Sequence, residues 1–143
     1  MRTRSATVED ASVLAELITQ LGYPTTAEEM RPRLWPMLAD PVYGTIVAEV
    51  DGAVVGMIGL RVDRGHEYDG VQGRIVALVV DAKFRGIGVG KALVREAEQW
   101  SSERSARKLM VNTSNYRTHT HEFYRHLGFD MTGLRFVKPL RSL

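Results

Sequence analysis

The chain has 143 residues, 44% of them hydrophobic and 25% charged, and a net charge of +2 at neutral pH. This length and composition are typical of one globular domain, and the small charge gives no general attraction to nucleic acid. The absence of cysteine excludes a disulfide scaffold, a thiolate zinc or iron–sulfur site and a cysteine nucleophile. The longest apolar run, residues 75–80, is far shorter than the about 20 residues of a membrane-spanning helix, and the N-terminus lacks an apolar signal region. We therefore expect one cytoplasmic domain, residues 1–143, that binds neither nucleic acid nor a membrane.

Two helices are predicted in the first third of the chain, after a short opening strand. Thr7 followed by Asp10 is the pattern of a helix start, in which a hydroxyl caps the helix and an acid follows three residues later. Apolar residues then recur at helical spacing until Gly22, which predicts the end of this helix. Thr25-Thr26, followed by two glutamates, opens a shorter helix. Pro32 and Pro36 must kink or split this second helix, because each removes a backbone donor.

The rest of the chain alternates between strand and helix patterns. Residues 45–50 and 53–60 flank Asp51-Gly52, a strong signal for a two-residue hairpin. The apolar run 75–80 predicts a strand that is buried on both faces. Beyond it the sequence predicts a glycine-rich turn and a helix, a strand at 109–111, a helix at 118–127 and a last strand at 134–137. The order β-α-α-β-β-β-α-β-α-β indicates an α/β fold with a mixed sheet and the later helices as crossovers.

The turn within residues 81–93 is the most informative segment. Glycines at positions 86, 88 and 90 follow the buried strand and lead into a helix. Without side chains they let the backbone curl so that several N–H groups point at one volume, and the helix N-terminus adds positive polarity there. Arg85 and Lys91 bracket the turn. The sequence therefore predicts an anion site that suits a diphosphate.

Three phosphate-binding patterns compete for this turn. A P-loop requires a glycine where Arg85 stands, and the Rossmann pattern requires one where Lys91 stands. The pattern R-x-x-G-x-G is met in full by Arg85, Gly88 and Gly90. A glycine-rich turn that binds nothing is the alternative that this segment by itself leaves open.

Three separate segments make the chain similar to a known family. Residues 4–11 (RSATVEDA), 78–90 (LVVDAKFRGIGVG) and 122–129 (EFYRHLGF) together resemble the GNAT superfamily of acyl-coenzyme A-dependent N-acetyltransferases. In that order they are similar to its opening strand and first helix, its acyl-CoA signature, and its closing helix and strand. The resemblance covers nearly the whole chain. It implies the GNAT fold, a mixed, mostly antiparallel central sheet of about six to seven strands flanked by about four helices.

The resemblance also implies where acetyl-CoA, the cosubstrate, binds. In the family the strand that here ends at Val80 splays from the next strand, and the pantetheine arm enters that gap and pairs with the main chain near Leu78 and Val80. The pyrophosphate rests on the N–H groups of the glycine turn, where the residues themselves predict an anion site. Arg117 stands where many members carry an asparagine that touches the cofactor arm, with Asn112 and Asn115 as nearby alternatives. The expected cofactor-binding residues are Leu78, Val79, Val80, Arg85, Gly86, Ile87, Gly88, Val89, Gly90, Lys91 and Arg117.

Attack of an amine on a thioester creates an oxyanion and expels a thiolate, so the site needs an oxyanion donor and an acid. The resemblance assigns the first role to a main-chain N–H near Leu78 or Val79. It assigns the second role to Tyr124, the expected catalytic residue, because a tyrosine at this place in the motif often lies beside the sulfur. A phenol with a pKa of about 10 is protonated at neutral pH and can protonate a thiolate. Packing against the cofactor or the sheet is the alternative role for Tyr124.

The base that takes the proton of the amine is not identified by the sequence. Alkyl amines have a pKa of about 10.4, so they are largely protonated at neutral pH. Some protein-acetylating members of the family carry a glutamate four residues before the acyl-contacting position, and this chain has Arg74 there. The alternatives that stay open are a chain of water molecules and the side chains of Glu49, Glu67, Asp69 and His119.

The acceptor is expected to be a primary amine on a small molecule or a peptide, attacked directly in a ternary complex. Aromatic and acidic residues of the first helices and of loop 65–70 suit a cationic amine, although loops are often polar for solubility alone. His119 and His121 lie two residues apart, on different sides of a helix, so they make a poor metal pair and no metal is expected. The fold often dimerises, and a homodimer stays open because no residue pattern marks an interface.

Two other functions compete with N-acetyl transfer. The missing base carboxylate supports a non-catalytic acyl-CoA binding or sensing module on the same fold, since a fold does not determine a function. Tyr124 counts against that alternative. A nucleotide-binding protein with an atypical P-loop is the third candidate, and it predicts protection by ATP and magnesium and not by CoA.

Overall fold

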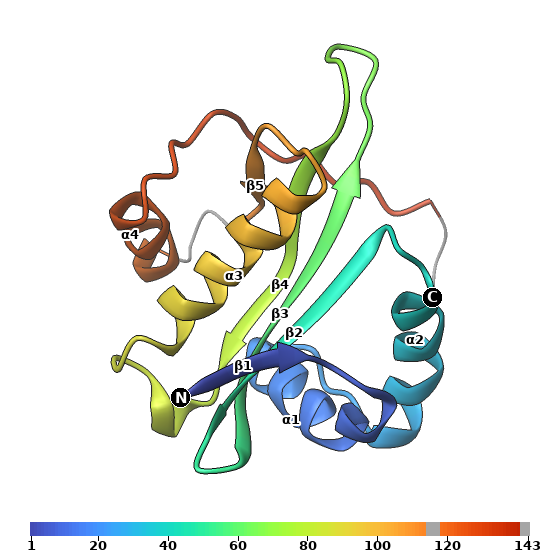
Figure 1. The fold of residues 1–143 in the computed structure, drawn as a ribbon, viewed down its shortest axis with the longest axis vertical. Coiled ribbons are helices and arrows are strands. Elements are labelled where there is room, and N and C mark those ends of the chain that lie inside the picture. Colours follow the sequence, from blue (N-terminus) through green and yellow to red (C-terminus); the bar gives the residue numbers. More distant parts are fainter. Residues whose placement is uncertain (114–117, 141–143) are drawn as a thin grey trace. The chain divides into compact units, whose positions relative to one another are not determined.

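The structure of the protein is a computed structural model that describes residues 1–113 and 118–140. The chain divides into two compact units, Met1–Val111 and Asn112–Leu143. The first unit contains the sheet and the second contains one described helix (Figure 1). Within the described residues, no helix is both long and apolar enough to cross a membrane.

The first unit is a sheet with helices on both faces. Its five strands lie in the order β1-β2-β3-β4-β5, and all neighbours are antiparallel except the parallel pair β4 and β5. The mixed, mostly antiparallel sheet expected from the sequence is therefore confirmed. The elements in chain order are β1 (Arg2–Ser5), the 3₁₀ helix η1 (Val8–Asp10), α1 (Ala11–Leu21), α2 (Ala27–Ala39), β2 (Tyr43–Val50), β3 (Ala53–Asp63), β4 (Gln72–Val80), the 3₁₀ helix η2 (Ala82–Phe84), α3 (Val89–Glu103) and β5 (Leu109–Val111).

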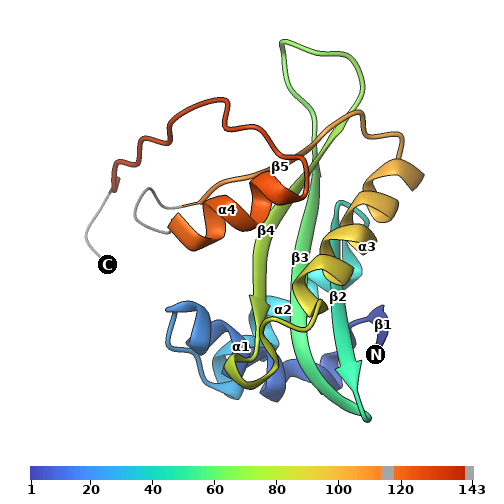
Figure 2. The same ribbon diagram turned by 90° about the vertical axis from the view of Figure 1, so that its left-hand side faces the viewer.

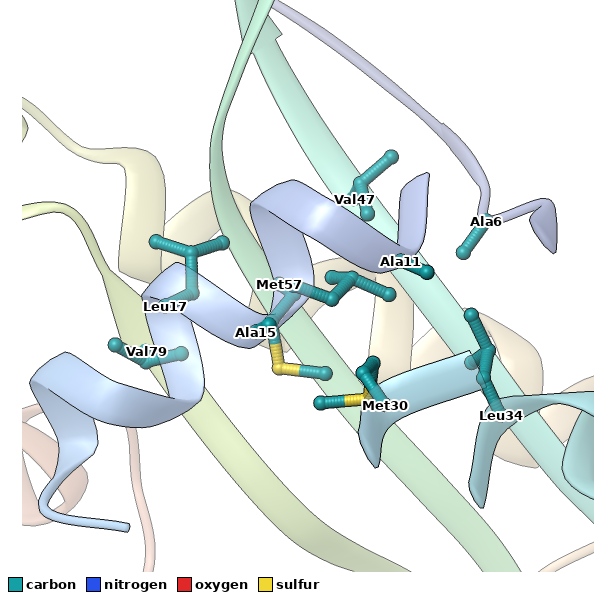
Figure 3. Close-up of a cluster of buried hydrophobic side chains, with 10 residues drawn as sticks. Ala6, Ala11, Ala15, Leu17, Met30, Leu34, Val47, Met57 and Val79 are labelled. Atoms are coloured by element: carbon teal, nitrogen blue, oxygen red, sulfur yellow. The ribbon is translucent and has the colours of Figure 1, made fainter. Parts of the chain in front are cut away.

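One face of the sheet packs against α1 and α2. Val47, Met57 and Val79 are neighbours in the register of β2, β3 and β4. They meet Leu17 of α1 and Met30 of α2 in a buried hydrophobic cluster (Figure 3). Burial of this apolar area is the main stabilising contribution on this side. We call the side of the sheet to which Val47, Met57 and Val79 point the α1/α2 face.

The opposite face packs against α3. A β-carbon on Gly56 of β3 would lie 3.1 Å from Val89 and 3.2 Å from Leu93, both buried on α3. A β-carbon on Gly44 of β2 would lie 2.6 Å from the ring of Trp100, closer than real side chains allow. The glycine at position 44 therefore permits α3 to lie directly on the sheet. The contact of Gly56 with Val89 lies at the N-terminus of α3, and the contact of Gly44 with Trp100 lies near its end, so α3 is held along its length.

The predicted starts of the first two helices and the predicted stop of the first are confirmed, whereas the second helix, expected to be shorter, has 13 residues against 11 in α1. Asp10 accepts a hydrogen bond from the N–H of Thr7 at 2.8 Å, and Gly22 ends α1 in the left-handed region with φ 118°. Helix α2 runs through Pro32 and Pro36 as one helix, so these prolines do not split it. Both prolines are exposed, and the carbonyls that lose a donor can bond to water instead.

The predicted hairpin at Asp51-Gly52 is also confirmed. Asp51 has φ 51° and Gly52 has φ 80°, so both residues lie in the left-handed region that a type I′ turn requires. The turn joins β2 to β3, whose register runs from Tyr43 opposite Arg61 to Val50 opposite Ala53.

The second unit contains α4 (Thr118–His126), which ends in a turn where Gly128 has φ 90°. Residues 129–139 form neither helix nor strand. The strand expected at 134–137 is therefore wrong, and the described residues form five strands where about six to seven were expected. A strand forms only where a neighbour supplies its hydrogen bonds. The side chains of Leu134 and Phe136 are 74% and 90% exposed, so the alternating pattern of this segment finds no partner.

Candidate functional site

Strand β4 has two very different edges. β3 pairs with it along its length, while β5 pairs with it only at Gly73–Ile75, near its beginning (Figure 2). The ladder with β3 shifts register at Val76, and such a β-bulge bends a strand. From Val76 to Val80, no strand in the described part of the chain pairs with the β5 side of β4. We call this segment of main chain the open edge.

The register shows which main-chain groups point toward the open edge. The N–H of Asp81 donates to the carbonyl of Val55 on β3 at 2.8 Å. Because residues of an antiparallel strand bond alternately to one side and to the other, Val79 also bonds toward β3. The N–H and C=O groups of Leu78 and Val80 therefore point toward the open edge. These are two of the residues that the resemblance assigns to the pantetheine arm.

The glycine turn that follows β4 ends in a helix whose first amides have no acceptor within the helix. Gly86 and Gly88 have φ 81° and 92°, and a β-carbon on either would meet nothing within 4 Å. The first bond of α3 runs from the N–H of Ala92 to the carbonyl of Gly88 at 3.0 Å. The amides of residues 89–91 are thus left without an intrahelical acceptor. The cap residue Gly88 has no side chain to serve them, and the first turn contains no acidic residue.

Asp81 anchors the beginning of this turn. Its carboxylate accepts the N–H of Lys83 at 2.9 Å and the side-chain amide of Gln20 at 3.3 Å, while Gln20 accepts the N–H of Ala82 at 3.0 Å. The bond from Lys83 and the contact with Gln20 hold the pKa of the Asp81 carboxyl below its usual value. Asp81 is therefore ionised at neutral pH and fastens the turn to the end of α1. Sequence reasoning missed Gln20, because nothing in the pattern of α1 indicates a contact with residues 81 and 82.

The other predicted cofactor residues divide by exposure. Val79 and Val89 are buried in the core, so only their main chain could contact a ligand. Ile87 is 63% exposed. Arg85 and Lys91 are exposed, and the Nε of Arg85 donates to the carbonyl of Val80 at 3.0 Å. The turn therefore combines unpaired amides with two cations.

Arg117 lies outside the described residues. Tyr124 belongs to α4 in the second unit, where its ring is buried and makes edge-on contacts with Phe123 and Phe129 at centroid distances of 5.2 and 5.3 Å. Burial raises the pKa of Tyr124 to about 12. No described residue hydrogen-bonds its hydroxyl, which also is not among the fully buried side-chain atoms that lack a partner. Tyr124 thus carries a hydroxyl that is protonated at neutral pH and that no described residue hydrogen-bonds.

The carboxylates considered as bases have different surroundings. Glu49 of β2 is ion-paired with Arg4 of β1. Glu67 and Asp69 are exposed in the loop between β3 and β4, and His119 is exposed on α4. Arg74, in place of a glutamate, donates to Asp63 of β3 at 2.8 Å. In the described part of the first unit, the carboxylate that contacts Arg74 is that of Asp63, which is already ion-paired.

The sequence predicts no metal site, because His119 and His121 make a poor pair of ligands. In residues 1–113 and 118–140, no group of three or more His, Cys, Asp or Glu side chains is arranged to hold a metal ion.

Comparison with known proteins identifies the family. The acetyltransferase (GNAT) family model matches residues 11–129. Aminoalkylphosphonate N-acetyltransferase of Salmonella typhimurium is 31% identical over 138 residues, which cover 96% of this chain and 90% of that enzyme. Aminoglycoside N(6')-acetyltransferase type 1 of Stenotrophomonas maltophilia is 29% identical over 135 residues, which cover 90% of this chain and 86% of that enzyme.

A solved structure has the same fold. AAC(6')-Iy, in complex with the bisubstrate analogue CoA-S-monomethyl-acetylneamine, superimposes with a TM-score of 0.86 over 99% of this chain and 98% of its own. Only 19% of the residues are identical, so this likeness concerns the fold alone. The family match and the two relatives confirm the resemblance seen in the sequence. The chain belongs to the GNAT family of acetyltransferases and transfers an acetyl group from acetyl-CoA to an amine.

Proposed function

We propose that the acceptor is a primary amine on a small molecule, which attacks the acetyl group directly while both substrates are bound. Acetyl-CoA supplies the acetyl group in an activated thioester. The observation that carries this proposal is the juxtaposition of the open edge of β4 with the uncapped N-terminus of α3, which follow each other in the chain. The open edge offers main-chain groups to the peptide-like pantetheine arm of acetyl-CoA. The N-terminus of α3 offers amides to its diphosphate.

The turn before α3 fits the pyrophosphate of acetyl-CoA. Three consecutive amides, at residues 89–91, have no acceptor within the helix, and the helix adds positive polarity at this end. Arg85 and Lys91 supply two further positive charges, and no acid lies in the first turn to repel an anion. Apart from chain neighbours, no atom of a described residue lies within 4 Å of a β-carbon built on Gly86 or Gly88. Each of these features favours a bound diphosphate.

The open edge fits the pantetheine arm and the thioester. The N–H of Leu78 points toward this edge, whereas the N–H of Val79 is directed to β3 by the register. We therefore assign the oxyanion role to Leu78 in preference to Val79. As negative charge develops on the thioester oxygen, the Leu78 N–H donates a hydrogen bond to it.

Tyr124 is our proposed acid for the leaving sulfur. Its pKa of about 12 keeps the phenol protonated at neutral pH, so its proton is present when the sulfur leaves. When the sulfur leaves, the hydroxyl donates its proton to the thiolate, and the phenolate is reprotonated from water. This role is supported by the Tyr124 hydroxyl, for which the described residues provide no hydrogen-bond partner.

The proton of the attacking amine leaves to water in this proposal. Glu49 is held by Arg4, and Asp63 is held by two arginines, so neither is available as a base. Without a base, the deprotonated amine is the reactive form, and alkyl amines have a pKa of about 10.4. The rate should therefore rise with pH through the range in which the amine loses its proton.

A panel assay of CoA release against small primary amines tests the proposal. We expect turnover with at least one class of amine, and we expect Tyr124→Phe to lower kcat about 10- to 100-fold while CoA affinity is unchanged. Because burial raises the pKa of Tyr124 to about 12, the wild-type rate should show no alkaline fall below about pH 10. Tyr23→Phe, a change at a 62% exposed tyrosine, is the matched control.

Other outcomes of these measurements would favour the alternative functions. CoA binding without turnover for any amine would favour a non-catalytic acyl-CoA module. Protection of the fold by ATP and magnesium, but not by CoA, would favour a nucleotide-binding protein. A Tyr124→Phe variant with wild-type kcat would remove Tyr124 from the mechanism.

A further inference from the structure

Two arginines lie directly opposite each other in the sheet and share one carboxylate. Arg61 of β3 and Arg74 of β4 are register partners in the antiparallel ladder, a position in which like charges repel. Asp63 accepts the Nε of Arg61 at 2.7 Å and the Nε of Arg74 at 2.8 Å. Burial opposes ionisation of Asp63, but the bonds from both arginines prevail and lower its pKa. One negative charge thus faces two positive charges, and one positive charge remains in excess.

The guanidinium groups of Arg61 and Arg74 differ in how many hydrogen bonds they donate. Arg61 donates to Asp63 through Nε and, at 3.4 Å, through Nη2. Arg74 donates only through Nε, and among the residues that the structure describes none binds its two terminal nitrogens. The Arg74 side chain is 26% exposed. Its terminal fork is therefore partly shielded, accessible, and of the planar shape that binds an oxyanion through two parallel bonds.

The acidic residues nearby do not occupy this fork. Glu67 and Asp69 lie in the loop that joins β3 to β4, and both are exposed. Neither forms an ion pair with Arg61 or Arg74 among the described residues. Neither acid of this loop therefore occupies the fork, and among the described residues none takes its terminal nitrogens, which leaves them available to an oxyanion of a bound molecule.

The position of the pair relates it to the acetyl-transfer site. Along β3, Arg61 alternates with its neighbours so that it lies on the same side as Met57, and its register partner Arg74 lies there with it. Both arginines are thus on the α1/α2 face. Arg74 is also four residues before Leu78 on the same strand, a separation of at most about 13 Å, because the bulge at Val76 shortens the extended chain. A short molecule that binds its anionic end at Arg74 can direct its other end toward the open edge.

We propose that Arg74, supported by Arg61, recognises an oxyanion on the acceptor, so that the preferred acceptor carries an amine at one end and a carboxylate or a phosphonate at the other. This inference rests on the proposed acetyl transfer and names the substrate class for it. It differs from the expectation of a cationic amine, because Arg74, on the same strand as the open edge, carries a positive fork that no described residue binds. Arg74 is a specificity residue here and takes no proton.

The experiment measures kcat and KM for amines of matched chain length. The probes are an ω-amino carboxylate, an aminoalkylphosphonate, an amino alcohol and a diamine, which separate the two anions from each other and from neutral and cationic ends. The wild-type enzyme should favour an anionic probe at least 10-fold in kcat/KM. Arg74→Gln should raise KM for that probe about 10- to 100-fold, as loss of a charge-assisted contact does, with kcat and the KM for acetyl-CoA unchanged.

Two further variants complete the test. Arg74→Glu should reverse the preference and favour the diamine. Arg95→Gln, a change at an exposed arginine on α3, is the control and should change no acceptor. Equal kcat/KM for the amino alcohol and the anionic probes, or an equal loss for every acceptor in Arg74→Gln, would overturn the inference and leave acetyl transfer intact. If no amine of any charge is acetylated while CoA binds, the proposed function itself fails, and the inference with it.

Discussion

Helices α2 and α3 both begin with amides that the helix itself cannot bond, and the two N-termini treat those amides differently. At α2, Thr26 accepts the N–H of Glu29 at 3.2 Å, and Glu29 accepts the N–H of Thr26 at 3.0 Å. Two acidic residues, Glu28 and Glu29, complement the positive end of that helix. This N-terminus is satisfied by the chain's own side chains and serves stability.

At α3 the corresponding groups are absent. Gly88 occupies the cap position and forms no side-chain bond, and no acidic residue follows in the first turn. Arg85 and Lys91 add positive charge where α2 has negative charge. The first amides of this helix are open to water or to a ligand, and under the proposed function the diphosphate of acetyl-CoA supplies their acceptors. The contrast teaches that two helix starts in one chain can differ in what is left to satisfy their amides: side chains at α2, and solvent or a ligand at α3.

Substitution of a glycine in the turn before α3 should distinguish ligand binding from stability most strongly. Gly88→Glu adds a side chain at φ 92° and a carboxylate against the phosphates, so we expect the Kd for CoA to rise more than about 100-fold in a calorimetric titration. Gly52→Glu is the matched control, because Gly52 also has a positive φ and open space around it but lies in the β2–β3 hairpin. Loss of CoA affinity in both variants to the same degree would show that general destabilisation is the cause.

Removing a cation from the same turn should have a smaller effect. Lys91 is exposed, and a solvent-exposed charge contact is worth about 1 kcal/mol or less. We expect Lys91→Gln to weaken CoA binding about threefold to fivefold at low ionic strength, with the difference shrinking in high salt. Lys108→Gln is the control. A loss that does not depend on salt would argue against an electrostatic contact with phosphate.

The cap of α2 should affect stability without affecting binding. Thr26→Ala removes the hydroxyl that accepts the Glu29 N–H, and loss of such a cap costs about 1 kcal/mol of the free energy of unfolding. Denaturant titration measures this cost, and the Kd for CoA should stay at the wild-type value. A change in CoA affinity would break the proposed division between the two helix starts.

The smallest effect concerns the pH dependence of the same cap. The bond from the Thr26 backbone, followed by the bond involving its hydroxyl, lowers the pKa of Glu29 below its usual 4.5. A carboxyl with a lowered pKa in the folded state stabilises the fold above about pH 4.5 and loses this contribution as the pH falls through the lowered value. Glu29→Gln should therefore lower the Tm at pH 7 and leave it unchanged near pH 2. An equal difference at both pH values would contradict the assignment.

Features that depend on residues close in sequence were predicted correctly. The Thr26 cap, the Gly22 stop and the Asp51-Gly52 hairpin are each confirmed, because the bonds that define them join residues close in sequence. The glycines at 86 and 88 likewise adopt the positive φ that their pattern predicts. The family and the acetyl transfer followed from three segments in the right order, and the comparisons confirm both.

Features that depend on distant partners were harder to predict. The prediction of a strand at 134–137 was wrong, because a strand requires a neighbouring strand and the residue pattern carries no information about one. The ion pairs of Asp63 with Arg61 and Arg74 depend on the register between β3 and β4, which a bulge at Val76 shifts. Gln20 contacts Asp81 across 61 positions of sequence. Sequence reasoning predicted the glycine turn, and only the structure shows what holds it in place.

A nuclear magnetic resonance titration of the full chain with CoA tests the central claim most directly. The account predicts that the amide signals of residues 86–91 shift most, together with those of Leu78 and Val80, while the amides of Thr26 and Glu29 keep their positions. Saturable shifts confined to other parts of the chain, with the amides of residues 86–91 unmoved, would contradict it.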